Sequence, residues 1–173
     1  MIMLWKWKKG EENYYEEIFN ELEKNKVDYL LIGGLAVALY GIPRVTGDLD
    51  LMLNMEPQNL EKFIKVMKKM GFKPKAPVNP EDLADAKKRE DWIKTKNMKV
   101  FSFQHPNNSY VLIDVMIDNP LNYQEAAEDK KLISCWGTKI YLIPKKLLIK
   151  MKKLAGRQQD LSDIEALLKS EEE

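Results

Sequence analysis

The chain has 173 residues, enough for one domain with a buried core, and its 28 Lys and Arg residues almost balance its 27 Asp and Glu residues. This balance provides no overall field that would attract a long polyanion or a membrane surface, so extended nucleic acid is not the favoured substrate. The single cysteine, Cys135, excludes an internal disulfide, and no apolar run reaches the roughly 18 residues of a membrane span, so we expect a soluble protein of the reducing cytoplasm.

The N-terminal elements are expected to cover a sheet. Trp5 and Trp7 alternate with lysines, a pattern typical of a strand or a docking segment, and plain packing is favoured over binding. From Asn13 to Lys26, apolar residues recur at helical spacing with charged residues opposite them, which predicts an amphipathic helix. A Lys- and Glu-rich composition with only three Arg residues is a hint of a thermophile.

The stretch from Tyr29 to Leu53 carries the most informative pattern. Short apolar runs at 28–32 and 49–53 predict buried strands. Between them, Gly33 and Gly34 permit a sharp turn, and the Ala- and Leu-rich segment that follows favours a short helix. The predicted order is strand, diglycine turn, helix, loop and strand.

Two aspartates at the start of the second strand are the anomaly. Asp48 and Asp50 share one face of the strand, because side chains alternate, and they stand about 6.6 Å apart along it. Two carboxylates beside an apolar layer repel each other and resist desolvation, so a cation is expected between them. Carboxylate oxygens suit Mg²⁺, and amides at a glycine turn before a helix suit a phosphate. These residues therefore predict a phosphate next to a metal.

The middle of the chain alternates helix and strand signals. Pro57 begins a predicted helix that ends at Gly71, the Pro-rich segment 73–79 predicts a loop, and Pro80 to Arg89 predicts a surface helix. Two β-rich runs, 98–104 and 110–117, flank a turn and predict a hairpin. His105, the single histidine, falls in that turn without any metal-ligand cluster and is interpreted as a loop residue.

The second strand of this hairpin contains another unusual carboxylate. Val111, Ile113 and Val115 share one face, which leaves Asp114 on the other. An aspartate within an apolar strand is costly unless it is paired. The alternative to a functional role is a half-buried aspartate that pairs with a lysine or caps a loop. Asp118, just past the strand, is interpreted as a turn or capping residue.

The C-terminal third predicts a small hairpin followed by two helices. Short strands at 132–134 and 139–142 flank Gly137. Pro144 is placed to begin a helix, Gly156 interrupts the helical pattern, and a second apolar stripe follows it.

Three motifs resemble the DNA polymerase β-type nucleotidyltransferase superfamily, in particular its small prokaryotic minimal and AbiEii-like members. Gly33-Gly34 is followed after thirteen residues by D-L-D-L at 48–51, with R-V-T-G immediately before the aspartates. The segment K-L-A-G-R-Q-Q-D-L-S-D-I at 153–164 is similar to the ending of AbiEii-like enzymes. The resemblance implies an α+β fold with a mixed sheet flanked by helices and a C-terminal helix pair. It also implies one domain, 1–173, with a catalytic core at 27–118 and with residues 119–173 packed on that core.

The resemblance implies the transfer of a nucleoside monophosphate from an NTP to a hydroxyl acceptor. Two Mg²⁺ ions would be held by the expected catalytic and metal-binding acids Asp48, Asp50 and Asp114. The expected nucleotide-binding residues are Gly33, Gly34, Arg44, Thr46 and Lys152. For Lys152 the alternative is one position on a solvated, Lys-rich helix face. Arg157, with Asp160 and Asp163, is equally explained as a network that only fixes the helix pair.

A second hypothesis is a catalytically silent binding protein with the same fold, such as the antitoxin of a toxin–antitoxin module. Retention of all three carboxylates favours the enzyme. A tRNA- or poly(A)-modifying enzyme is disfavoured by the near-neutral charge. The acceptor, whether a small molecule, a partner protein or an RNA end, stays open. The choice of NTP and the oligomeric state, including a homo-oligomer, stay open as well.

Overall fold

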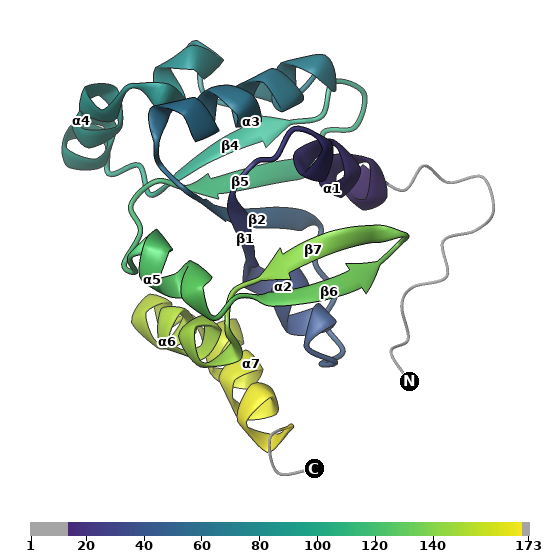
Figure 1. Ribbon diagram of the computed structural model, residues 1–173. Helices are drawn as coiled ribbons and strands as arrows, with labels where there is room; N and C mark the ends of the chain where they lie inside the picture. Colours follow the sequence, from purple (N-terminus) through teal and green to yellow (C-terminus); the bar gives the residue numbers. More distant parts are fainter. Residues whose placement is uncertain (1–13, 171–173) are drawn as a thin grey trace.

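The computed structural model describes residues 14–170, so the pattern at Trp5 and Trp7 lies outside it. Its centre is a seven-stranded mixed sheet with strand order β3-β4-β5-β2-β1-β7-β6 (Figure 1). The strands are β1 Tyr29–Ile32, β2 Asp48–Leu53, β3 Lys73–Pro74, β4 Val100–Gln104, β5 Leu112–Met116, β6 Lys131–Cys135 and β7 Thr138–Leu142. The predicted mixed sheet is confirmed.

Helices flank this sheet. They are α1 Tyr14–Lys24, α2 Gly33–Leu39, α3 Pro57–Lys69, the 3₁₀ helix η1 Pro80–Ala84, α4 Ala86–Lys96, α5 Tyr123–Glu128, α6 Lys145–Ala155 and α7 Gln158–Lys169. Helices α6 and α7 lie side by side at the end of the molecule opposite α3 and α4, which confirms the predicted C-terminal helix pair (Figure 1). None of the helices within residues 14–170 combines the length and the apolar character of a membrane span.

Strand β2 organises the sheet from its centre. It runs antiparallel to β1 and parallel to β5. The side chains of Leu49, Leu51, Ile113 and Val115 are almost completely buried. This face is covered by α3, because Phe63 of α3 packs edge-to-face on the Phe103 ring of β4. The polar positions of β2 and β5 alternate with these residues and therefore lie on the other face.

Two predictions for residues 73–89 were wrong. The segment 73–79, expected to be a loop, begins with the short edge strand β3, which pairs with β4. The pairing with β4 continues one residue past β3, where the Lys75 amide donates to the Ser102 carbonyl at 2.9 Å. The helix expected from Pro80 to Arg89 is instead η1 followed by α4. Asp85 separates them, because its carboxylate accepts from the amides of Lys87 and Lys88 and caps a new helix.

The predicted C-terminal hairpin is confirmed as β6 and β7, and β7 adds in parallel to β1. Gly137 takes φ +73° in its turn, and Gly156 takes φ +64° where α6 ends, two positions where a left-handed backbone favours glycine. Helix α5 has no counterpart among the predicted elements. It spans only six residues and is capped by the Asn122 side chain, which accepts from the Glu125 amide.

Candidate active site

Three aspartates meet on the face of the sheet that α3 does not cover. Asp50 of β2 and Asp114 of β5 are directly paired in the parallel register, and Asp48 precedes Asp50 by two residues on the same face. Neighbouring strands are about 4.8 Å apart, so the carboxylates of Asp50 and Asp114 start from adjacent backbone positions. All three side chains are half-buried. The structure thus brings the predicted acids together.

The three carboxylates repel one another, and this repulsion affects the pKa values of Asp50 and Asp114. Burial, followed by the repulsion of the Asp114 and Asp48 carboxylates, raises the pKa of Asp50 to about 7. Burial is also the main cause that raises the pKa of Asp114, and the Ser102 side chain on β4 opposes it. Within the described residues, the buried Oδ1 atom of Asp114 has no hydrogen-bond partner. A bound cation would stabilise both groups. It would coordinate the buried Asp114 oxygen that lacks a donor, and it would favour the ionised form of the Asp50 carboxyl, whose pKa is raised to about 7.

The fit of the acids to a metal rests on their chemistry. Three carboxylates supply only oxygen ligands, the type that Mg²⁺ prefers, and one of those oxygens has no hydrogen-bond partner in the part of the chain that the structure describes. Within residues 14–170, however, no group of three or more His, Cys, Asp or Glu side chains is already arranged so that it could hold a metal ion. The aspartates are therefore neighbours with suitable donor atoms, but their side chains do not form a preorganised metal-coordination site.

The two glycines allow the close approach of helix α2 to the acids. Gly33 has φ +71°, and a Cβ added there would stand 2.0 Å from the Asp50 Oδ2 atom. At Gly34, a Cβ would come within 3.0 Å of the Thr46 side chain. The predicted diglycine turn is in fact the first turn of α2, packed directly on Asp50 and Thr46.

The loop before β2 connects the acids to two other parts of the chain. The Thr46 hydroxyl contacts the Asp48 carbonyl at 3.5 Å, and the Tyr15 hydroxyl of α1 donates to the Thr46 carbonyl at 3.4 Å. Arg44 reaches the C-terminal helices, where its Nε atom lies 3.3 Å from Asp163 Oδ1. Burial and the charges of Asp48 and Asp50 raise the pKa of Tyr15, so this residue belongs to the surroundings of the acids. The sequence pattern indicated only that Tyr15 lies on a helix, and it did not mark Tyr15 as a site residue.

The C-terminal helices are joined by a buried ionic cluster. Lys152 of α6 is 5% exposed, and its ammonium lies 3.2 Å from Asp160 and 2.7 Å from Asp163 of α7. Arg157 Nε lies 2.8 Å from Asp160, so the network suggested as an alternative is present. Lys152, predicted to bind the nucleotide, therefore already has two carboxylate partners.

Arg157 is the cationic residue that sequence reasoning did not select. Its side chain is 76% exposed, and its charge, together with that of Lys152, opposes the upward shift of the Asp50 pKa. The guanidinium is thus both accessible and electrostatically linked to the acids. The only signal in the sequence was its place in the R-Q-Q-D motif.

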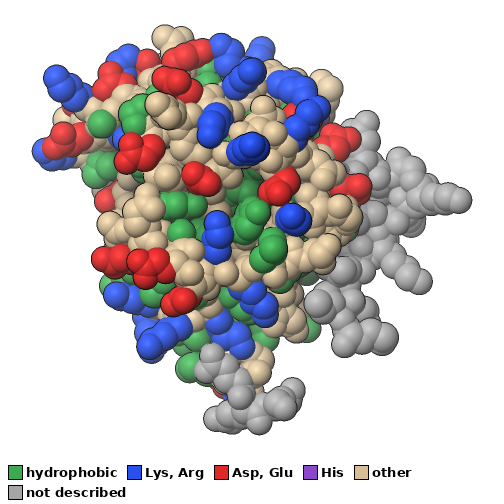
Figure 2. Space-filling model, viewed as in Figure 1, with side chains coloured by type: hydrophobic (Ala, Val, Ile, Leu, Met, Phe, Trp, Pro, Cys, Tyr) green, Lys and Arg blue, Asp and Glu red, His purple; other side chains and the backbone are tan. Residues whose placement is uncertain are grey.

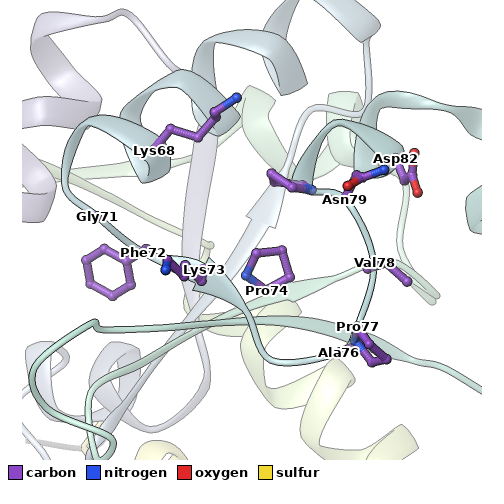
Figure 3. A pocket seen from close by; sticks show the side chains of 11 residues that line it. Lys68, Gly71, Phe72, Lys73, Pro74, Ala76, Pro77, Val78, Asn79 and Asp82 are labelled. Atoms are coloured by element: carbon purple, nitrogen blue, oxygen red, sulfur yellow. The ribbon is translucent and has the colours of Figure 1, made fainter.

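A separate pocket lies at the β3 edge of the sheet. Its volume is about 720 Å³, and its lining includes Phe72, Pro74, Pro77 and Val78 (Figure 3). None of the predicted site residues lines it.

Comparison with known proteins gives the fold. No protein-family model and no curated protein matches the sequence. Among solved structures, the lincosamide antibiotic adenylyltransferase LnuA bound to lincomycin is similar at 18% identity, over 89% of this chain and 95% of that one, with a TM-score of 0.59. ANT(2'')-Ia in complex with adenylyl-2''-tobramycin gives 11% identity, over 90% and 86%, with a TM-score of 0.58.

A nucleotidyltransferase-like protein from Paracoccidioides brasiliensis gives 19% identity, over 88% of this chain and 72% of that one, with a TM-score of 0.53. At such identities the likeness shows a shared fold. The chain therefore has the fold of the nucleotidyltransferases.

Proposed function

We propose that this chain is a Mg²⁺-dependent nucleotidyltransferase that moves a nucleoside monophosphate from an NTP to a hydroxyl acceptor. The observation that carries the proposal is the pairing of Asp50 with Asp114 on adjacent strands. The Asp50 carboxyl has a raised pKa of about 7, and the Asp114 carboxyl has a buried oxygen that no described residue hydrogen-bonds. The adenylyltransferase fold neighbours, one bound to lincomycin and one to an adenylyl-tobramycin, support a small-molecule acceptor.

In the proposed reaction, an acceptor hydroxyl oxygen forms a bond to the α-phosphorus of the NTP, and the bond between that phosphorus and the leaving pyrophosphate breaks. Asp48, Asp50 and Asp114 would hold two Mg²⁺ ions, which when bound neutralise the phosphate charge and the charge that builds on the leaving group. Asp114, the carboxylate nearest the proposed acceptor, would accept the hydroxyl proton.

The remaining residues would position the nucleotide. The α2 glycines let the backbone approach Asp50 and Thr46 closely, and in the proposed complex their backbone amides would hold the triphosphate. The exposed Arg157 guanidinium is oriented by Asp160 and supplies a planar donor group for the triphosphate. Arg44 and Thr46 fix the loop that leads into β2, whereas Lys152 acts by holding α6 against α7.

The direct test is turnover of the four NTPs with Mg²⁺, measured as pyrophosphate release and as transfer of α-phosphate label. We expect Asp48→Asn, Asp50→Asn and Asp114→Asn each to lower the rate by about 100-fold or more, because the donors for the cations are lost. Asp118→Asn is the matched control, since Asp118 is exposed just past β5, and it should retain the rate. Full activity in Asp50→Asn would contradict the proposal.

The alternative is a catalytically silent binding protein, such as the antitoxin partner in a two-gene module. The observation that favours this alternative is that, within residues 14–170, no set of three or more His, Cys, Asp or Glu side chains is preorganised to coordinate a metal. Incubation with labelled NTPs and a co-expressed neighbouring protein separates the two functions. Label on that protein supports a modifying enzyme of a toxin–antitoxin module, and a stable complex without any nucleotide turnover supports the silent partner.

A further inference from the structure

A row of polar side chains continues from the aspartates toward the β3 edge of the sheet. Asp50 pairs with Asp114, Asp114 pairs with Ser102 of β4, and the Lys75 amide donates to the Ser102 carbonyl. Cross-strand partners share one face of a sheet, so Lys75 extends the row of acids by two strands. By strand alternation the backbone position of Lys73 falls on the same face, because Pro74 between the two lysines pairs with the buried Phe103, and Lys73 also lines the pocket at the β3 edge.

The two ends of this row carry different cations. The charges of Arg157 and Lys152 act on Asp50, whereas the charge of Lys75 acts on Asp114. The acids are therefore flanked by a basic group from the C-terminal helices on one side and by a basic group from the β3 edge on the other. A transferase needs two substrate sites, one on each side of its reacting centre.

The nucleotide is best placed on the side of Asp50. That side contains the α2 glycines, which pack on Asp50, and the exposed Arg157 guanidinium. The acceptor then approaches from Asp114, Ser102 and Lys75. Lys73 and Lys75 are both exposed, and the ion pairs formed within residues 14–170 involve neither of them.

Building on the proposed transferase function, we propose that the acceptor is an anionic hydroxyl compound, such as a phosphorylated small molecule, whose negative group is bound by Lys75 and Lys73 at the β3 edge. The hydroxyl then lies at Asp114, two strands from the lysines, and its oxygen attacks the α-phosphorus as described above. The same lysines repel a polycationic acceptor, so acceptor charge becomes the main source of selectivity.

The simpler explanation for Lys75 is that it only balances the charge of Asp114. A balancing lysine would affect every acceptor equally, because it would act through the aspartate. A binding lysine affects only acceptors that carry the negative group. Acceptor charge therefore separates the two roles.

The experiment compares matched acceptors under Mg²⁺ and labelled NTP. One set is glucose, glucose 6-phosphate and glucosamine, and the other is glycerol, glycerol 3-phosphate and 3-amino-1,2-propanediol. We expect kcat/KM for a phosphorylated member to exceed that of its neutral and cationic counterparts by about tenfold or more. Lys75→Met should raise the KM for that member about five- to tenfold and leave the KM for the NTP unchanged.

Lys65→Met is the matched control, because Lys65 is an exposed lysine of α3, the helix that covers the opposite face of the sheet, and it should change neither KM. Lys75→Arg should keep the preference for the phosphorylated member. Equal or better transfer to the neutral or cationic members, or labelling of no member while the NTP is hydrolysed by water, would overturn the inference. So would a Lys75→Met effect on all acceptors alike. Neither labelling of any acceptor nor hydrolysis of the NTP would instead mark a failure of the proposed function itself, because NTP hydrolysis by water needs no acceptor.

Discussion

At the residue scale, Asp50 ties the stability of the protein to its site. Its pKa in the folded chain is about 7, above the ordinary value of 3.8, because of burial and the neighbouring acids. Between these two pH values the folded state binds more protons than the unfolded state, so the free energy of unfolding falls as pH rises from about 4 to about 7. The site therefore costs stability at neutral pH.

The variant Asp50→Asn cannot ionise and should escape this loss. We expect it to be more stable than the wild type at pH 8 by roughly 2–4 kcal/mol in metal-free buffer, and about equally stable near pH 4. Urea unfolding of both proteins across this pH range measures the difference. A constant difference at every pH would show that Asp50 does not carry the raised pKa.

Gly33 is the second residue on which the site geometry depends. An added Cβ at Gly33 would meet the Asp50 carboxylate at 2.0 Å, whereas at Gly137 it would meet no atom of residues 14–170 within 4 Å, although the two glycines have similar positive φ values of +71° and +73°. Gly137→Ala should therefore cost about 1 kcal/mol from backbone strain alone. Gly33→Ala should cost at least about 1 kcal/mol more, since Asp50 must also move.

Thermal and urea unfolding of the two glycine variants give this comparison, and NTP turnover gives its functional counterpart. Gly33→Ala is expected to lose activity, while Gly137→Ala, at the tip of the β6–β7 hairpin, keeps it. Equal costs in both variants would mean that α2 does not press on Asp50.

At the scale of elements, the helix pair α6–α7 depends on its buried ionic cluster. Lys152→Met would leave Asp160 and Asp163, 1% and 3% exposed, without their shared ammonium. Removal of one member of a buried ionic group lowers the free energy of unfolding by about 3–5 kcal/mol. For Lys152→Met we expect a value toward the lower end of this range, because Arg44 and Arg157 still neutralise part of the charge of the two aspartates.

The control for this variant is Lys94→Met, which breaks the exposed pair with Glu90 on α4 and should leave the free energy of unfolding nearly unchanged, because water and salt screen an exposed pair. Chemical unfolding of both variants at pH 7 measures the two costs. Similar small values would mean that solvent reaches Lys152 and that the cluster does not hold the helices.

Element by element, the success of sequence-based prediction follows the strength of the local signal. Strands β1, β2, β4 and β5 were predicted because period-two burial and turn residues are encoded locally. Strand β3 was missed because it has two residues and exists only through its pairing with β4. The helix predicted from Pro80 to Arg89 is interrupted at Asp85, which caps α4. The prediction failed there because an aspartate can either cap a new helix or occupy an exposed position within a helix, and its residue type does not distinguish the two.

The candidate site divides in the same way. Asp48, Asp50 and Asp114 were identified because a carboxylate in an apolar strand is a local anomaly that needs no tertiary information. Arg157, Tyr15 and Lys75 were not identified, because surface-type residues become part of a site only when distant elements pack together. Their partners lie on other strands and helices, and local patterns do not record such contacts.

At the scale of the whole molecule, charge is spread rather than concentrated. Acidic and basic side chains alternate over most of the visible face, and Lys and Arg gather in two places, at the upper right over the region of α3 and lower down around α6 and α7 (Figure 2). With a net charge of +1, we expect no binding to a 20-base-pair duplex in a mobility-shift assay at 150 mM salt. Binding with a steep salt dependence would instead restore nucleic acid as a substrate class.

In the proposed function, Asp48, Asp50 and Asp114 together bind divalent cations beside a nucleotide. The most direct measurement is a Mn²⁺ titration followed by electron paramagnetic resonance, in the presence of a non-hydrolysable ATP analogue. We expect two Mn²⁺ ions in each complex of the wild type with the analogue, retention of both in Asp118→Asn, and loss of at least one in each of Asp48→Asn, Asp50→Asn and Asp114→Asn. Equal Mn²⁺ binding by the wild type and Asp50→Asn would contradict it.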